Sequence, residues 1–138
     1  MKVYVAASSQ DMERARLWME RLGDFGVDVT SNWVNTIQAV GIANPREATN
    51  WQRRNWSHED LVGVDEADML WFLVPEKANG RGAYFEAGYA LGVGKHLVFS
   101  GDTRQSIFCG LGKEFMTDDD AFNSIIDTHN AVACWEGL

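Results

Sequence analysis

Short apolar runs alternate along this chain with longer stretches in which apolar residues recur every three or four positions. Residues 3–7 form the first apolar run, and the polar turn 8–10 ends it, which predicts a buried strand. From residue 11 to about 25 the apolar positions have helical spacing, with charged residues on the other side. A second, shorter strand is predicted over 27–30. Residues 31–49 contain several Asn and Gly residues and a Pro, and they predict a covering loop with room for a short helix.

The middle of the chain continues this alternation. Thr49 or Asn50 is expected to cap a helix that runs to about residue 66. The run 69–74 is continuously apolar and is bounded by Asp68 and Pro75, as is typical of a central parallel strand that is covered on both faces.

A helix over 83–94, a strand over 96–100 and a last helix that begins with the acidic residues 118–120 complete the pattern. Alternating strands and helices indicate an α/β fold, in which helices cover both faces of a parallel sheet. We expect a three-layer sandwich around four to five strands, formed by residues 1–138 as a single domain. Ligands of such sheets bind beyond the carboxyl ends of the strands. Segments 7–10, 75–86 and 100–107 are predicted to meet at that edge.

The charge of the chain narrows the classes of partner. The formal net charge is -8, from 12 basic and 20 acidic residues. Nucleic acid and anionic membranes attract basic surfaces, so we expect neither as a partner, whereas a small anionic ligand needs only a local pocket. No apolar run is long enough for a membrane span. Cys109 and Cys134 show neither a disulfide framework nor metal-ligand spacing, which favours a reduced, cytoplasmic protein without a metal or other cofactor.

Several enzyme classes lack their sequence motifs here. The first strand is followed by no G-x-G-x-x-G fingerprint, and residues 92–95 lack the spacing of a phosphate-binding P-loop. No G-x-S-x-G nucleophile elbow is present. His58, His96 and His129 are isolated and are expected to be surface or core residues. Nicotinamide-dependent dehydrogenases, nucleoside triphosphatases and serine hydrolases are therefore disfavoured.

The segment 80–92 is small and apolar, and Glu86 is its one acid. Burying an ionised carboxylate is costly unless it is paired or hydrogen-bonded. We expect Glu86 at the start of a helix, where the free N–H groups keep it ionised. It is then either a nucleophile at the mouth of a pocket or a structural partner of Arg81 or Arg54. Gly88 and Gly92 lie four positions apart, a spacing that permits close approach of another backbone and suggests a dimer contact.

The combined motifs resemble the nucleoside 2-deoxyribosyltransferase-like family, which includes deoxyribosyltransferases and 2'-deoxynucleoside 5'-phosphate N-hydrolases. The resemblance covers roughly residues 2 to 126. It is carried by Tyr4 with Ser8-Ser9, by the segments 29–33, 58–61 and 66–70, and above all by Gly82-x-x-x-Glu86-x-Gly88-Tyr89-Ala90-Leu91-Gly92. This resemblance implies a flavodoxin/Rossmann-like fold and chemistry at the N-glycosidic bond of a nucleoside or nucleotide.

The resemblance also implies roles for individual residues. Glu86 matches the nucleophile that attacks C1' of the sugar, Asp60 matches the acid that assists the leaving base, and Tyr4 lies at the position of an active-site tyrosine. Further implied substrate contacts are Ser8 and Ser9 of the first-strand loop and Ser106, which matches a serine that some members donate across a dimer interface. Members with a serine in the loop before the nucleophile place it near a phosphate, and this chain has Asn79 and Arg81 instead. We expect Asn79, Gly80 and Gly82 of that loop to contact the substrate. The family thus implies a homodimer or higher homo-oligomer.

These residues also make chemical sense without the resemblance. Glycoside cleavage passes through an oxocarbenium-like state that one carboxylate captures while a second, protonated acid assists the leaving group. We expect Glu86 to be ionised and Asp60 to have the raised pKa. Trp33, Trp56 or Trp71 is a candidate to stack on the base. The alternative is a non-catalytic module that binds a nucleotide or an ADP-ribose-type ligand. The sequence leaves open the base, the sugar, a 5'-phosphate and hydrolysis versus transfer.

Overall fold

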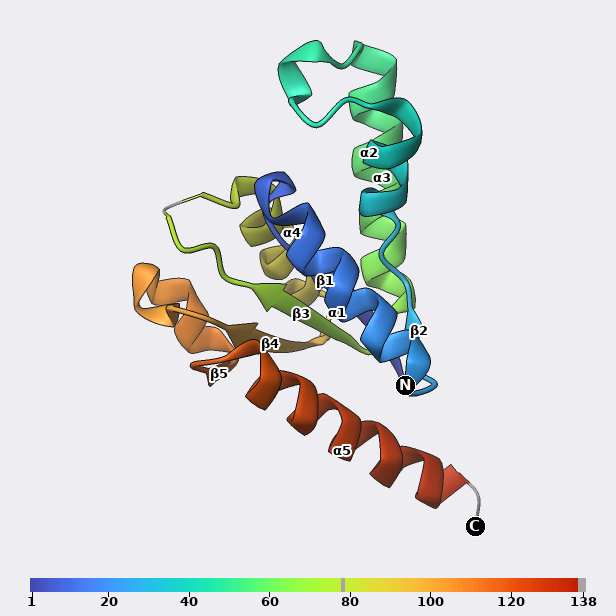
Figure 1. The fold of residues 1–138 in the computed structure, drawn as a ribbon, viewed down its shortest axis with the longest axis vertical. Coiled ribbons are helices and arrows are strands. Elements are labelled where there is room, and N and C mark those ends of the chain that lie inside the picture. Colours follow the sequence, from blue (N-terminus) through green and yellow to red (C-terminus); the bar gives the residue numbers. More distant parts are fainter. Residues whose placement is uncertain (78, 137–138) are drawn as a thin grey trace.

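The computed structural model describes residues 1–77 and 79–136, and its sheet confirms the predicted α/β fold. Five parallel strands form the sheet in the order β2-β1-β3-β4-β5, a flavodoxin-type order (Figure 1). Their bounds are β1 Lys2–Ala6, β2 Asp28–Val29, β3 Met69–Leu73, β4 His96–Ser100 and β5 Lys113–Phe115. The order reverses between β1 and β3, and this is where such sheets bind ligands.

Helices cover both faces of the sheet and complete three layers. Their bounds are α1 Met12–Asp24, α2 Trp33–Val40, α3 Asn50–Glu66, α4 Arg81–Gly92 and α5 Asp118–Glu136. On one face, Trp18 of α1 and Ile125 of α5 pack with Trp71 of the sheet. On the other face, Val64 of α3 and Ala87 of α4 pack with Phe72. Since β3 contacts both clusters, all five of its residues are buried, as its continuous apolar run predicted.

Element boundaries confirm most of the sequence pattern. Thr49 caps α3 in a capping box, in which its hydroxyl accepts from the Gln52 N–H at 3.0 Å and its own N–H donates to the Gln52 side chain at 2.9 Å. Helix α4 begins at Arg81, two residues earlier than predicted, because Gly80 with φ 87° turns the chain into the helix. The sequence pattern did not place strand β5, because this strand is short and largely exposed.

The segment 31–49 holds a complete helix, α2, followed by a 3-10 turn over Pro45–Glu47. The connection between α2 and α3 stands away from the sheet at the top of Figure 1. We call α2, α3 and this connection the arm. Throughout residues 1–77 and 79–136, every helix is too short or too polar to span a membrane.

Candidate active site

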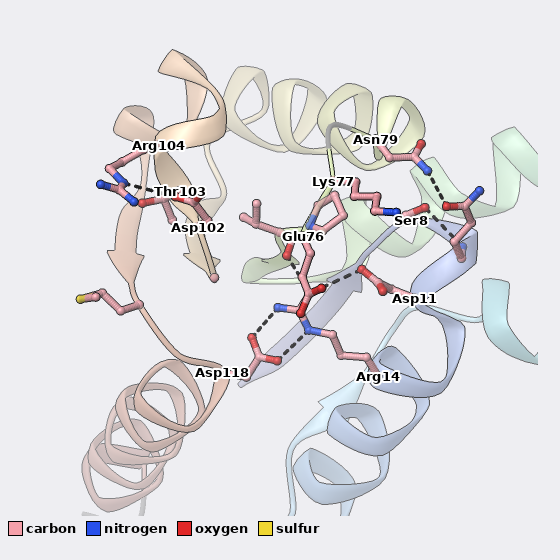
Figure 2. A pocket seen from close by; sticks show the side chains of 15 residues that line it. Ser8, Asp11, Arg14, Glu76, Lys77, Asn79, Asp102, Thr103, Arg104 and Asp118 are labelled. Carbon is pink, nitrogen blue, oxygen red and sulfur yellow. Dashed lines mark hydrogen bonds and ion pairs between the residues drawn. The ribbon is translucent and has the colours of Figure 1, made fainter.

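Two adjoining cavities lie at the carboxyl ends of the strands, where the sequence predicted a ligand. The smaller one, about 500 Å³, lies between the arm and the loops that follow β1 and β3. The larger one, about 1050 Å³, lies over the loops after β1, β3 and β4 (Figure 2). Ser8 and Asn79 line both cavities. The three predicted segments therefore do meet at one edge of the sheet.

Tyr4 and Glu86 meet beneath the smaller cavity. Tyr4 is fully buried on β1, and its hydroxyl donates a hydrogen bond to the Glu86 carboxylate. Glu86 itself lines the cavity, whereas Tyr4 does not. Tyr4 thus reaches the cavity only through Glu86, and its burial raises the pKa of its own hydroxyl far above the usual range. In the described chain, no ion pair joins Glu86 to Arg81 or Arg54, so the structural pairing considered from the sequence is absent.

Asp60 faces the same cavity from α3. Burial raises its pKa to about 7, and the neighbouring charge of Glu59 adds to the effect. Burial likewise raises the pKa of Glu86 to about 8, the negative charge of Asp60 raises it further, and the Tyr4 hydrogen bond opposes both. Both carboxyls therefore titrate near neutral pH, Asp60 before Glu86.

The expectation that the helix N-terminus keeps Glu86 ionised is wrong. Glu86 is the sixth residue of α4 and lies in its second turn. The favourable effect of a helix dipole is concentrated in the first turn, so desolvation prevails. The predicted rise in the pKa of Asp60 is confirmed, but Glu86 shares it.

The walls of the smaller cavity include most of the predicted substrate contacts. Ser8, Ser9, Trp33, Asn79, Gly80 and Gly82 all line it. The Trp33 indole is oriented by its Nε1–H, which donates to the Val5 carbonyl at 2.9 Å. Trp56 also lines the cavity. Trp71 is fully buried and donates to the Ser100 hydroxyl at 2.9 Å, so it is excluded from stacking on a ligand.

The loop before α4 is tied in place from two sides. The Asn79 amide donates to the Gln10 side chain at 3.0 Å, and its oxygen accepts from the Gly80 N–H at 2.8 Å. Gln105 donates to the carbonyl of Pro75 at 2.6 Å. A side chain on Gly80 would meet the Phe72 ring at 3.5 Å and would need an unfavourable φ. Pro75 and Asn79–Gly80 are therefore each held in place at the junction of the two cavities.

Ser106 lies outside both cavities. Its hydroxyl accepts from the Phe108 N–H at 3.2 Å and caps a 3-10 turn. The sequence reading missed the residues that the arm contributes to the smaller cavity, which are Thr36, Ile37, Ile42, Ala43, Asn44 and Pro45. The one available signal was the apolar character of 31–49, which indicated that this segment covers something.

The larger cavity has an arginine in its floor whose donors are all used. Arg14 donates from Nε and one amino group to Asp118 at 2.7 and 2.8 Å, as Figure 2 shows. It also donates to the Val74 carbonyl at 2.7 Å and, at 3.4 Å each, to Asp11 and to the Ser100 carbonyl. Asp118 accepts in addition from the Trp18 indole and the Ser100 hydroxyl. This network joins α1 and α5 and lowers the pKa of Asp118, although burial opposes that direction.

Across the described residues, no cluster of three His, Cys, Asp or Glu side chains has the geometry to hold a metal ion. The two cavities instead present carboxyls, hydroxyls, amides and indoles. A half-buried pair of carboxyls with raised pKa values at one cavity is a candidate site for proton transfer and nucleophilic attack.

Comparison with known proteins shows what this fold is similar to. Neither the models of known protein families nor the curated protein sequences match the chain. Among solved structures, it is similar to one described as a 2-deoxyribosyltransferase from the psychrotolerant bacterium Bacillus psychrosaccharolyticus, a biocatalyst for nucleoside synthesis. The TM-score is 0.67 with 19% sequence identity, and the match covers 89% of this chain and 91% of the other. At this identity the likeness shows a shared fold.

Proposed function

We propose that the protein cleaves or transfers the N-glycosidic bond of a nucleoside or deoxynucleoside, or of its 5'-monophosphate. The observation that carries the proposal is the meeting of Glu86 and Asp60 at one cavity, with Tyr4 hydrogen-bonded to Glu86 from below. A volume of about 500 Å³ suits a small-molecule ligand. The fold shared with a 2-deoxyribosyltransferase supports the same chemistry.

In the proposed reaction, the ionised Glu86 carboxylate attacks C1' of the sugar. The bond between C1' and the base nitrogen breaks, its electron pair stays on the base, and protonated Asp60 supplies a proton to the base. A glycosyl ester on Glu86 results. Water then attacks C1', gives its proton to the Asp60 carboxylate and releases the free sugar. Alternatively, a second base attacks C1', loses its N–H proton to Asp60 and forms a new nucleoside. In either case the Glu86 carboxylate is regenerated.

The pKa values suit these roles only if the two carboxyls share one charge. The Tyr4 hydrogen bond favours the charge on Glu86, because it stabilises the ionised form of that residue. With pKa values of about 7 for Asp60 and about 8 for Glu86, the reactive form, an ionised Glu86 beside a protonated Asp60, is a minority form that is most abundant between pH 7 and 8. Acid assistance of this kind accelerates bond cleavage by about 10²–10⁴-fold.

The test incubates purified protein with ribo- and deoxynucleosides and their 5'-monophosphates, with and without an acceptor base, and measures free base by chromatography. Glu86→Gln, which keeps the side-chain volume, is the inactive variant, and Glu66→Gln at the exposed end of α3 is its matched control. We expect base release with the wild type and Glu66→Gln and none with Glu86→Gln. Turnover by Glu86→Gln would contradict the nucleophile assignment.

A second candidate is a non-catalytic module that binds a nucleotide or an ADP-ribose-type ligand. The raised pKa of Glu86 favours it, because a protonated carboxyl donates hydrogen bonds to ribose hydroxyls but is no nucleophile. The same incubation distinguishes the two functions. An intact nucleotide that stays bound to the protein throughout would support binding alone.

We also propose a homodimer through the outer side of α4. Gly88 and Gly92 are exposed there, and a side chain on either would meet no atom within 4 Å. Phe85 on the same helix is 69% exposed, and Ile107, directly after Ser106, is 87% exposed. A second copy would cover these apolar side chains. Light scattering at micromolar concentration tests this, and a monomer there would overturn it.

A further inference from the structure

The larger cavity adjoins the smaller one, but neither the proposed glycosidic reaction nor the proposed dimer contact uses it. It has about twice the volume of the smaller cavity, and the two share the side chains of Ser8 and Asn79. Glu86 and Asp60 line only the smaller one. The two cavities therefore meet at Ser8 and Asn79, where the Asn79 amide donates to the Gln10 side chain at 3.0 Å.

The position of the reacting bond determines which part of a substrate lies toward this junction. Glu86 must face C1' and Asp60 must face the base, so the base lies toward the arm, beside Trp33 and Trp56. The sugar then lies toward the loops after β1 and β3, which carry Ser8 and Asn79. The group attached to the sugar at C5' is the part of the substrate that extends past these two side chains.

The charges around the larger cavity determine what kind of group fits. Its lining carries four carboxylates and three cations. Arg14 has no free donor, because all five of its N–H groups are engaged by Asp118, Asp11 and two backbone carbonyls. Arg104 lies at the rim, 92% exposed, and pairs with Asp102 at 3.3 Å. Among the described residues of the lining, the cations left for a phosphate are Lys77 and the Asp102-paired Arg104, both exposed at the rim, and the four carboxylates of the cavity would repel its two negative charges.

The two rims of the cavity each carry charges of both signs. Glu76 and Lys77 follow β3, and Asp102 and Arg104 follow β4 on the opposite side (Figure 2). Facing acids and bases match a zwitterion, whose ammonium and carboxylate groups pair with opposite partners. A space of this size also exceeds what a 5'-hydroxyl alone would fill.

We propose that the larger cavity is a subsite for a 5'-substituent of the substrate, and that it selects a zwitterionic substituent over a 5'-phosphate. The inference rests on the proposed N-glycosidic reaction and names the substrate class for it, a nucleoside extended at C5' by an amino-acid-like group. The reacting bond and the roles of Glu86 and Asp60 are unchanged.

The experiment compares three substrates that share the base and sugar preferred in the nucleoside panel. They carry a 5'-hydroxyl, a 5'-monophosphate or a 5'-homocysteinyl thioether. We expect kcat/KM for the thioether to exceed that for the monophosphate at least about tenfold, because like charges facing each other across a binding surface are costly. Equal or faster turnover of the monophosphate would overturn the proposal.

Two variants test separately how the volume of the larger cavity and the charges at its rim affect substrate preference. Thr103→Trp fills the larger cavity and is expected to lower the ratio of kcat/KM for thioether over hydroxyl about tenfold. Asp102→Lys reverses one rim charge and is expected to raise kcat/KM for the monophosphate relative to the thioether. If Thr103→Trp lowers all three rates equally and Asp102→Lys leaves the ratio unaltered, the cavity is no subsite.

The failure of this inference is distinguishable from the failure of the proposed function. If no substrate releases its base, the glycosidic reaction is wrong, and calorimetry of the three compounds on Glu86→Gln protein then tests the subsite alone. Tighter binding of the thioether than of the hydroxyl compound supports the subsite. Equal binding of the two overturns it.

Discussion

The hydroxyl of Tyr4 donates its hydrogen bond to the carboxylate of Glu86, a residue 82 positions later in the chain. The contact joins the first strand to the middle of α4 and favours an ionised Glu86, whereas burial and the charge of Asp60 oppose ionisation. Tyr4→Phe keeps the ring in the core and removes only this donor. We expect the pKa of Glu86 to rise and the pH optimum of base release to move up, with a lower maximal rate. An unaltered optimum in the pH–rate profile of Tyr4→Phe would contradict the role.

The pH dependence of the wild type follows from the two raised pKa values. Activity needs an ionised Glu86 and a protonated Asp60, so kcat/KM is expected to form a bell with its maximum between about pH 7 and 8. Because the carboxyls interact, the two limbs belong to the pair. A flat profile between pH 5 and 9 would exclude this pair as the titrating groups.

Asp60→Asn tests which of the two residues produces each limb of the pH–rate profile. It removes the acid that assists the leaving base, which is expected to lower the maximal rate by about 10²–10⁴-fold. It also removes the negative charge that raises the pKa of Glu86, so the remaining rise in rate is expected at lower pH. Above that rise the rate should reach a plateau. A profile that still falls at high pH would show that another group is the acid.

Burial of Glu86 is expected to reduce the stability of the protein at alkaline pH. Its pKa rises from 4.5 to about 8 on folding, so the folded chain binds more protons than the unfolded chain between these values. The free energy of unfolding then decreases as pH rises through this range. Glu86→Gln carries no such titration, and its stability relative to the wild type should increase between pH 5 and 9 by an amount on the order of a few kcal/mol. Urea unfolding of both proteins at the two pH values measures the difference, and a constant difference would contradict the raised pKa.

Gly63 on α3 allows the close packing that brings Asp60 to the site. A side chain there would meet the Thr30 carbonyl at 2.8 Å and the Tyr4 ring at 3.0 Å. Gly63→Ala is expected to push α3 outward, to lower the free energy of unfolding by about 1–3 kcal/mol and to reduce activity. As Asp60 recedes from Glu86, the pH optimum should fall.

The matched control for that variant is Gly23→Ala on α1, where a side chain would meet no atom within 4 Å. Alanine in an open helical position is expected to be neutral or to stabilise by up to about 1 kcal/mol. Thermal unfolding and the pH–rate profile check both variants. Full activity with an unaltered optimum in Gly63→Ala would show that α3 tolerates the displacement without consequence.

The amino-acid sequence by itself determined the alternation of strands and helices, the buried run of β3 and the edge of the sheet at which the two cavities lie. The local spacing of apolar and polar residues predicts these features, because each depends on neighbours within a few helical turns or one strand. The prominence of Glu86 as the one acid in a small apolar segment was also visible, and so were Ser8 and Ser9 at the end of the first strand.

Only the tertiary structure decided how these parts act on one another. Burial raises the pKa of Glu86, and the charge of Asp60, on another helix, raises it further. No spacing along the chain encodes that burial or that proximity. Trp33 lines the cavity while Trp71 lies in the core, although both are tryptophans in apolar stretches. The engagement of all Arg14 donors likewise depends on residues up to 104 positions away. Desolvation and hydrogen-bond partners are properties of the packed chain, so the chemistry of the site becomes defined only when its elements are in contact.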